Sequence, residues 1–495
     1  MIKKVLITWI LALCLLGGPM VGNALAQDAS PSVSPSPELS APATVPGEPA
    51  DASRQEASPA VAEAPKIDTG DTAFMLISSA LVLLMTPGLA FFYGGLVRSR
   101  NVLNTIMMSF ILMGVVGVTW TLWGYSLAFA PTSLTPGADP PFSANPFIGS
   151  LNWLFLNNVA FDQPDPVGYA GTIPHQVFMV YQMMFAIITP ALISGAIVER
   201  MSFKAYFWFI LLWSTFIYSP LAHWVWGKGW IGTFGALDFA GGTVVHISSG
   251  VSAVVAAWVI GPRKSFMVTP HAPHNVPYVL LGIGMLWFGW FGFNAGSALT
   301  AGSLAAVAFV ATMVAAAAGG LTWVILEWLL RGKPTAIGIA SGFLGGLVGV
   351  IPAAGYVNPL GAIFIGSVTS VCCFFAVSLR AKLQFDDSLD TFPIHGVGGT
   401  IGALLTGLVA TTTVNSAGDN GLFFGNPVQL WEQIVGVLAT YVFAGVGTFA
   451  ILKLLSLAMD LRVKPNAEDQ GLDINEHGEE GYGEDFTTGL SFKGE

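Results

Sequence analysis

Residues 72–100 read TAFMLISSALVLLMTPGLAFFYGGLVRSR. No charged residue lies between Thr72 and Val97, and Arg98 and Arg100 follow at once. A run of about 20 apolar residues is long enough to cross the hydrocarbon core of a bilayer as a helix. The two arginines mark a cytoplasmic end, because basic residues concentrate in cytoplasmic loops. The segment therefore predicts a transmembrane helix that ends in the cytoplasm.

The same pattern recurs along the rest of the chain. The composition agrees, with 53% hydrophobic and only 10% charged residues, whereas soluble domains have about a quarter charged residues. We therefore predict an all-α polytopic membrane protein with eleven transmembrane helices. The expected spans are 72–96, 103–130, 174–198, 205–222, 240–260, 277–299, 303–330, 335–353, 357–379, 394–413 and 428–460.

The basic residues predict the orientation of these spans. Alternate loops contain nearly all of them, and the opposite loops contain only Lys228. This asymmetry puts the mature N-terminus outside and the C-terminal tail in the cytoplasm, which requires an odd number of spans, as eleven is. The residues on the cytoplasmic side are Arg98, Arg100, Arg200, Lys204, Arg263, Lys264, Arg331, Lys333, Arg380 and Lys382.

The formal net charge of −10 belongs to the two ends of the chain. Residues 1–26 contribute +2, residues 27–71 contribute −6, residues 72–464 contribute +2 and residues 465–495 contribute −8. We expect both acidic segments to be solvated tails. Nucleic acid is not an expected partner, because there is no basic stripe to contact phosphates.

Four regions follow from these patterns. Residues 1–26 have the basic, apolar and small-residue order of a signal peptide, with cleavage after Ala26; an uncleaved membrane anchor is the alternative. Residues 27–71 are rich in Pro, Ser and Ala and are expected to form a disordered extracytoplasmic linker. Residues 72–464 form the membrane domain, and 465–495 a cytoplasmic acidic tail. The three cysteines fit neither a disulfide framework nor a zinc motif.

The spans divide into two halves of comparable length. Spans one to five and six to ten would have opposite orientations, as inverted five-helix repeats do, followed by a long eleventh helix. His246 lies in the fifth span and His395 in the tenth. Buried histidines are often core residues, but two at matching positions suggest proton transfer or hydrogen bonding to a small substrate. No metal site is expected, because further ligands are missing.

Charged residues near the spans have structural explanations. Asp238 precedes the fifth span and is expected to cap its N-terminus. Glu327 lies one helical turn before Arg331, near the cytoplasmic end of its span, and is expected either to be solvated there or to pair with Arg331. Glu199 and Arg200, at a cytoplasmic end, are expected to be paired within the fold. Glycine-rich runs such as residues 342–349 are expected to let helices pack closely.

Aromatic residues suggest a site for a cation. Trp224 is expected to be an interfacial tryptophan. Trp226, Phe185 and Phe293 could be core or interface residues, but aromatic faces also attract a desolvated cation.

With these residues on view, the sequence resembles the ammonium transporter family (Amt/Mep/Rh), and in particular its bacterial Amt branch. The resemblance covers about residues 70–482. The most specific match runs from Gly235 to His246 (GALDFAGGTVVH). The other matching stretches are 92–96 (FYGGL), 289–297 (GWFGFNAGS), 331–334 (RGKP) and 471–479 (GLDINEHGE).

The resemblance implies an ammonium channel that is a homotrimer with one pore in each subunit. It implies that ammonium is recruited at an outer site, deprotonated, and conducted as ammonia, with or without the proton, into the cytoplasm. It also implies a nitrogen regulatory protein of the PII type as a possible partner at the cytoplasmic face, and no cofactor. The site residues that it implies are Trp226, Phe185 and Ser297 for recruitment, Asp238 as support, Phe185 and Phe293 as the gate, and His246, His395 and Trp290 along the pore.

Three other classes remain as alternatives. A sensor that binds ammonium would have to signal through its short tail and a partner. Another ion-coupled transporter or cation channel would need a midplane carboxylate, unwound backbone or a carbonyl-lined filter, and none is evident. An enzyme is not expected, because the sequence has no nucleophile–base set. The expected location is a bacterial inner membrane.

Overall fold

The computed structural model describes residues 66–135, 140, 142–268 and 272–482. Contacts divide the chain into two units, Met1–Lys66 and Ile67–Glu495, and the fold below is that of the second. The expected signal peptide and most of the expected linker lie outside the described residues.

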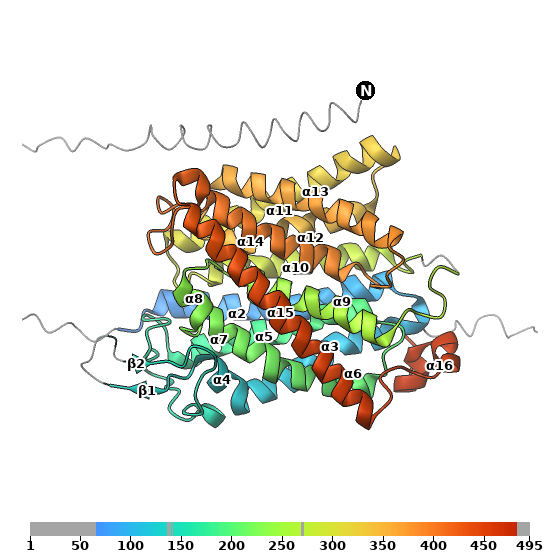
Figure 1. Cartoon of the computed structure of the whole chain (residues 1–495), viewed down its shortest axis with the longest axis horizontal. Coiled ribbons are helices and arrows are strands. Elements are labelled where there is room, and N and C mark those ends of the chain that lie inside the picture. Colours follow the sequence, from blue (N-terminus) through green and yellow to red (C-terminus); the bar gives the residue numbers. More distant parts are fainter. Residues whose placement is uncertain (1–65, 136–139, 141, 269–271, 483–495) are drawn as a thin grey trace, which may run out of the picture. The chain divides into compact units, whose positions relative to one another are not determined.

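Eleven helices among the described residues are long and apolar enough to cross a membrane, which confirms the predicted fold class (Figure 1). In chain order they consist of α2 (Thr69–Leu96); η1 (Ser99–Asn101), α3 (Val102–Thr119), η2 (Trp120–Gly124) and α4 (Tyr125–Phe129); α5 (His175–Ile197); α6 (Phe203–Trp213), η4 (Ser214–Tyr218), α7 (Ser219–Val225) and α8 (Trp230–Phe234); η5 (Gly242–Ile247) and α9 (Ser248–Ile260); α10 (Val276–Gly296); α11 (Ser303–Arg331); α12 (Ala336–Val350) and η6 (Ile351–Ala353); α13 (Pro359–Lys382); η7 (Phe392–Gly396) and α14 (Val397–Val409); and α15 (Pro427–Ala458).

The spans differ from their predicted bounds mostly by a few residues, and two of the differences have a structural interest. The fourth span was expected at 205–222 but extends over Phe203–Phe234. The tenth was expected to end at residue 413 but ends at Val409. The backbone N–H of Thr412 donates to Oδ1 of Asn420 at 2.9 Å, so this stretch forms loop hydrogen bonds in place of another helical turn. Hydropathy alone does not detect such a bond.

Glycines bring the helix backbones into direct contact. A Cβ atom on Gly319 of α11 would lie 2.5 Å from the carbonyl oxygen of Gly342 and 2.8 Å from Cα of Gly346, both on α12. A Cβ atom on Gly282 of α10 would lie 2.3 Å from the backbone nitrogen of Phe92 on α2. Small residues at helix crossings are the usual basis of close packing in membranes, and the glycine-rich runs have the expected role.

The helices differ strongly in how much of their surface is covered. Of the apolar window in α5, 89% is buried, compared with 33% in α15. Figure 1 shows α15 as the long helix that runs diagonally across the others. The central α5 therefore provides side chains to the interior, and α15 lies at the periphery of the helices.

The fifth and tenth spans begin in the same way. Asp238 and Asp387 each stand eight residues before a histidine. Asp238 accepts hydrogen bonds from the N–H groups of residues 241–244 at 2.6–3.2 Å. Asp387 accepts from Thr391 at 3.0 Å and from Phe392 at 2.7 Å. Each carboxylate caps a π-helical turn, η5 or η7, that contains the histidine.

The C-terminal tail corrects an expectation, because residues 465–482 are not simply solvated. α16 (Pro465–Gln470) and η9 (Asp473–His477) contact the starts of α3 and α6. Asp473 accepts from the N–H groups of Leu103 and Asn104 at 3.0 and 2.8 Å, and Glu476 accepts from Phe203 at 2.7 Å. These acidic residues are therefore caps for the first turns of α3 and α6.

The described residues between α4 and α5 are joined by short-range bonds. β1 (Ser133–Leu134) pairs antiparallel with β2 (Phe142–Ser143), and η3 (Leu154–Leu156) and η8 (Leu422–Phe424) are short turns in the loops between spans. Asp165 accepts from the N–H groups of Val167, Tyr169 and Ala170 at 2.8–3.0 Å. These bonds fix residues 165–170 shortly before α5 begins.

Candidate functional site

The two predicted histidines meet in the interior. Nδ1 of His246 lies 2.9 Å from Nδ1 of His395, and their rings are nearly parallel at 18°. Both side chains are buried, at 2% and 1% exposure. One Nδ1 must carry the shared hydrogen and the other must accept it. The Nε2 atoms consequently differ, since one ring keeps an Nε2 acceptor and the other an Nε2–H donor.

The surroundings of this histidine pair are apolar. Trp290 stacks on His246 with ring centroids 5.6 Å apart and an angle of 14°. Nε2 of His246 has no hydrogen-bond partner in the described part of the chain. No group of three or more His, Cys, Asp or Glu side chains that could hold a metal ion occurs among the described residues. Nε2 of His246 is thus free to form a hydrogen bond with a small molecule.

Two phenylalanines lie next to the pair. Phe185 of α5 and Phe293 of α10 have ring centroids 4.3 Å apart, and Phe293 lies 6.3 Å from His246. Their exposed fractions are 1% and 0%. The expected gate residues are thus in contact and separate the histidine pair from the residues described next.

Trp226 and Ser297 form the outermost part of the site. Trp226 contacts Phe185 edge to face, with centroids 5.8 Å apart, and its Nε1–H donates to the backbone carbonyl of Asp238 at 2.9 Å. The hydroxyl of Ser297 donates to the carbonyl of Phe293 at 2.9 Å. The structure therefore brings the three expected recruitment residues next to the gate, with two of them half-buried.

Asp238 supports this arrangement from behind. Its carboxylate is occupied by the backbone N–H groups that it caps, as expected. Burial raises the pKa of Asp238 to about 6, although these N–H bonds act in the opposite direction. Gly241 has φ +112°, and a Cβ atom there would lie 2.7 Å from Cγ2 of Val245 and 3.1 Å from the Trp226 ring. Glycine is required at this close turn.

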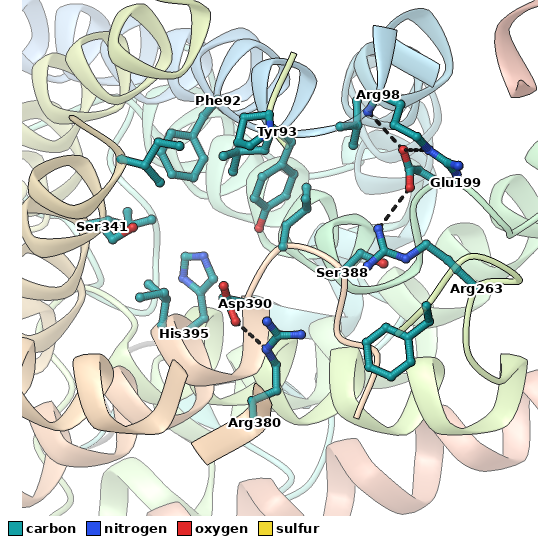
Figure 2. A pocket seen from close by; sticks show the side chains of 18 of the residues that line it. Phe92, Tyr93, Arg98, Glu199, Arg263, Ser341, Arg380, Ser388, Asp390 and His395 are labelled. Atoms are coloured by element: carbon teal, nitrogen blue, oxygen red, sulfur yellow. Dashed lines mark hydrogen bonds and ion pairs between the residues drawn. The ribbon is translucent and has the colours of Figure 1, made fainter. Parts of the chain in front are cut away.

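A cavity of about 600 Å³, called the vestibule below, borders His395 (Figure 2). Its arginines and Glu199 were expected at this end of the spans, whereas Asp390 was not singled out from the sequence. Asp390 pairs with Nε of Arg380 at 2.5 Å, and burial raises the pKa of Asp390 to about 6. The residues lining this vestibule include Phe92, Tyr93, Arg98, Glu199, Arg263, Ser341, Leu344, Arg380, Ser388, Asp390, Ile394 and His395.

Glu199 joins two loops at the edge of the vestibule, as Figure 2 shows. It accepts from Arg98 at 2.9 Å and from Arg263 at 3.0 Å, and Arg263 also pairs with Asp386 at 2.7 Å. Burial alone would raise the pKa of Glu199, but the two arginines outweigh it and lower the pKa to about 2. Glu199 is therefore charged at any physiological pH.

The expectations for the other charged groups were correct in outline. Glu199 and Arg200 are both paired, but with partners from other loops; Arg200 lies 3.9 Å from Asp386. Glu327 pairs with Arg331 at 3.1 Å, as expected, and also accepts from the N–H of Thr335 at 2.7 Å.

Three features of the site were not predicted from the sequence. Tyr181 lies behind Ser297, with its hydroxyl 3.2 Å from the serine Oγ. The charge cluster of the vestibule joins loops far apart in sequence, so no local pattern predicts it. Asp387 could have been found, because its spacing to His395 equals that of Asp238 to His246.

Comparison with known proteins agrees with this geometry. The sequence profile described as "Ammonium Transporter Family" matches residues 73–482. The chain belongs to the ammonium transporter family. An ammonium transporter of *Bacillus subtilis* (strain 168) is 51% identical over 414 residues, which cover 83% of this chain and 98% of the relative. One from *Aquifex aeolicus* (strain VF5) is 49% identical over 84% of this chain and 94% of the relative.

Solved structures of the ammonium transporter family share the fold. The crystal structure of Mep2 from *Saccharomyces cerevisiae* has a TM-score of 0.73 and 36% identity, and the match covers 81% of this chain and 91% of that one. A structure described as "Sensor Amt Protein" has a TM-score of 0.72 and 27% identity over 82% of this chain and 98% of that one. The relatives are named as transporters, in agreement with the expectation that the chain is not an enzyme.

Proposed function

We propose that this member of the ammonium transporter family recruits ammonium at Trp226, Phe185 and Ser297. It then removes one proton and conducts ammonia past His246 and His395 into the cytoplasm. The observation that carries the proposal is the buried histidine pair with its 2.9 Å Nδ1–Nδ1 distance. A hydrogen-bonding pair with an unpartnered Nε2, enclosed by Trp290 and Phe293, suits a small neutral molecule that both donates and accepts hydrogen bonds.

Selection at the outer site follows from the chemistry of ammonium. Ammonium and potassium are similar in size, so charge and radius do not separate them. Ammonium donates directional hydrogen bonds to an oxygen such as Oγ of Ser297, and the rings of Trp226 and Phe185 attract a cation at their faces. Only ammonium can then shed a proton and continue as a neutral molecule. Burial of a bare cation beyond the gate would cost several kcal/mol.

The deprotonation step breaks one N–H bond and leaves its electron pair on nitrogen. The proton either returns to the outer solution or follows the ammonia along the histidine pair. The two routes differ by one elementary charge for each ammonia delivered, and a current measurement therefore distinguishes them. The histidines bind ammonia in both cases, because their ring nitrogens offer one acceptor and one donor.

The assembly and its location extend the same proposal. The protein is a homotrimer of the bacterial inner membrane, with one pore in each subunit, its N-terminus outside and its tail in the cytoplasm. The basic residues of alternate loops support the orientation. A cleaved signal peptide at residues 1–26 is consistent with an outer N-terminus. A regulatory protein of the PII type docks at the vestibule and controls the release of ammonia from the pore into the cytoplasm.

A sensor role is a second candidate, supported by the contacts between tail and loops. Asp473 and Glu476 bond to the loops that hold Arg98 and Glu199, so a movement at the vestibule would reach the tail. The similar structure described as "Sensor Amt Protein" adds to this possibility. Signalling would require a separate protein that binds the tail.

The test uses the full-length protein in liposomes on a solid-supported membrane. We expect transient currents or methylammonium uptake with ammonium salts and none with potassium in the wild type. His246→Ala should abolish transport or admit potassium, and Phe293→Ala should alter the gate. Gly284→Ala, at a position with no atom within 4 Å of the added Cβ, is the matched control. Wild-type uptake and selectivity in His246→Ala would contradict the histidine role.

A further inference from the structure

Tyr181 connects three parts of the outer site. It lies on α5, one helical turn before Phe185, and its ring contacts that phenylalanine edge to face at 5.0 Å. Its hydroxyl lies 3.0 and 2.9 Å from the carbonyl oxygens of Gly292 and Phe293, and 3.2 Å from Oγ of Ser297. The side chain is 1% exposed, so it supports the site from within the protein.

The hydrogens of these groups can be assigned by their chemistry. A carbonyl oxygen only accepts, so the Tyr181 hydroxyl must be the donor to Gly292 and Phe293. A phenol has one hydrogen, and this contact uses it. In the contact between Tyr181 and Ser297, the serine must therefore be the donor. The second hydrogen bond of the Ser297 hydroxyl, to the Phe293 carbonyl at 2.9 Å, also requires the serine to donate.

In both bonds, to Tyr181 and to the Phe293 carbonyl, the hydroxyl hydrogen of Ser297 points into the protein. The serine oxygen then has its lone pairs left for the half-buried outer side. This polarity suits ammonium, which only donates. It is unfavourable for a donor hydroxyl to point its hydrogen at a cation, and two inward acceptors reduce the time that Ser297 spends in that orientation.

The end of α10 explains why the two hydroxyls gather there. The backbone N–H of Ser297 donates to the carbonyl of Asn294 at 3.2 Å, which leaves the Phe293 carbonyl to side-chain donors. Gly296 gives the phenol its room, because a Cβ atom there would lie 2.7 Å from the Tyr181 hydroxyl oxygen. The backbone of the gate residue and the hydroxyl of the recruitment residue thus share one support.

We propose that Tyr181 is a positioning residue for ammonium recruitment, which orients the Ser297 hydroxyl so that its oxygen accepts from the cation. The inference rests on the proposed recruitment role of Ser297. Tyr181 acts through Ser297 and need not touch the substrate itself.

The experiment is a double-mutant cycle on the full-length protein in liposomes. Ammonium-induced currents are recorded over a range of concentrations for wild type, Tyr181→Phe, Ser297→Ala and the double variant. Tyr206→Phe is the matched control. Tyr206 lies on α6, and the substitution removes a buried tyrosine hydroxyl that donates to the Met108 carbonyl at 2.8 Å. Monodisperse elution of every variant in size-exclusion chromatography verifies folding.

We expect Tyr181→Phe to raise the half-saturating ammonium concentration about three- to tenfold, the range that the net worth of one hydrogen bond gives. The maximal current should change less than twofold. In the Ser297→Ala background, the same substitution should have no further effect, and Tyr206→Phe should resemble wild type.

Three results would overturn the inference. An unchanged half-saturation in Tyr181→Phe, or an equal effect in the Ser297→Ala background, would refute the positioning role and leave the recruitment role of Ser297 intact. A wild-type half-saturation in Ser297→Ala would instead refute recruitment by Ser297 and, with it, the role of Tyr181. The failure of the inference and that of the proposed function are therefore distinguishable.

Discussion

The distance between the two histidines depends on a glycine that touches neither ring. Gly250 of α9 faces the backbone at the start of the tenth span. A Cβ atom there would lie 2.3 Å from the nitrogen and 2.5 Å from Cα of Gly396, the neighbour of His395. Ordinary contacts begin at 3.4 Å. Gly250→Ala must therefore separate the two backbones by about 1 Å.

The consequence for transport follows from the geometry of the pair. If the displacement passes to His395, the Nδ1–Nδ1 distance of 2.9 Å increases by about 1 Å, beyond hydrogen-bonding range. Overpacking of this kind also costs about 1–3 kcal/mol of stability. Misplacement by about 1 Å in a functional constellation can cost about a hundredfold in rate. We expect ammonium transport to fall about ten- to a hundredfold.

The assay is ammonium-induced current in liposomes, normalised to the amount of folded protein. Gly399→Ala provides a milder step, since its Cβ would lie 3.0–3.1 Å from Gly242 O and from side-chain atoms of His246 and Ile247. Gly284→Ala provides the open control. Transport should decrease in the order Gly284, Gly399, Gly250. Gly250→Ala currents equal to those of Gly284→Ala would refute the reasoning.

Three further predictions concern the outer site, the cytoplasmic network and the tail. Trp226→Leu should raise the half-saturating ammonium concentration about tenfold through the lost cation–π attraction; unchanged concentration dependence of the current would argue against recruitment there. Because the pKa of Glu199 is lowered to about 2, its stabilising charge is complete above the unfolded value near 4.5 and is lost as the pH falls through 2. Glu199→Gln should therefore lower the melting temperature in detergent at pH 7 and reduce the loss of stability between pH 5 and pH 3; an equal acid response in both proteins would contradict this. Asp473→Asn should weaken the cap of α3 by about 1 kcal/mol and accelerate trypsin cleavage after Arg462 about fivefold, which timed proteolysis at pH 7 measures against wild type.

Much of the architecture could be predicted because a bilayer imposes a simple rule. A helix must be apolar over a fixed length, so residues 72–96 were sufficient to place the first span, which the structure has at Thr69–Leu96. The same rule does not predict irregular turns within a span. The π-helical turns at Trp120–Gly124 and Ser214–Tyr218 leave the hydropathy unchanged, so composition does not reveal them.

The site was predictable to different degrees for a similar reason. His246 and His395 stand out because ionisable groups are costly in lipid. Tyr181 does not, since an aromatic residue in an apolar helix has many possible roles, and only the position of its hydroxyl distinguishes it. Glu199 was recognised as paired, but its partners Arg98 and Arg263 come from loops separated from it by 101 and 64 residues. Such partners emerge only once the spans are packed.

The capping of early helices by the tail has a consequence for biosynthesis. α3 and α6 leave the ribosome long before Asp473 and Glu476, whose carboxylates later bond to the first N–H groups of those helices. Until translation is finished, the N–H groups of Leu103, Asn104 and Phe203 have only water or membrane headgroups as partners. The last segment to be synthesised therefore completes structures begun among the first. A chain truncated before Asp473 would insert all its spans and yet lack these bonds at the starts of α3 and α6, a defect by which quality-control proteases could distinguish it from the full-length protein.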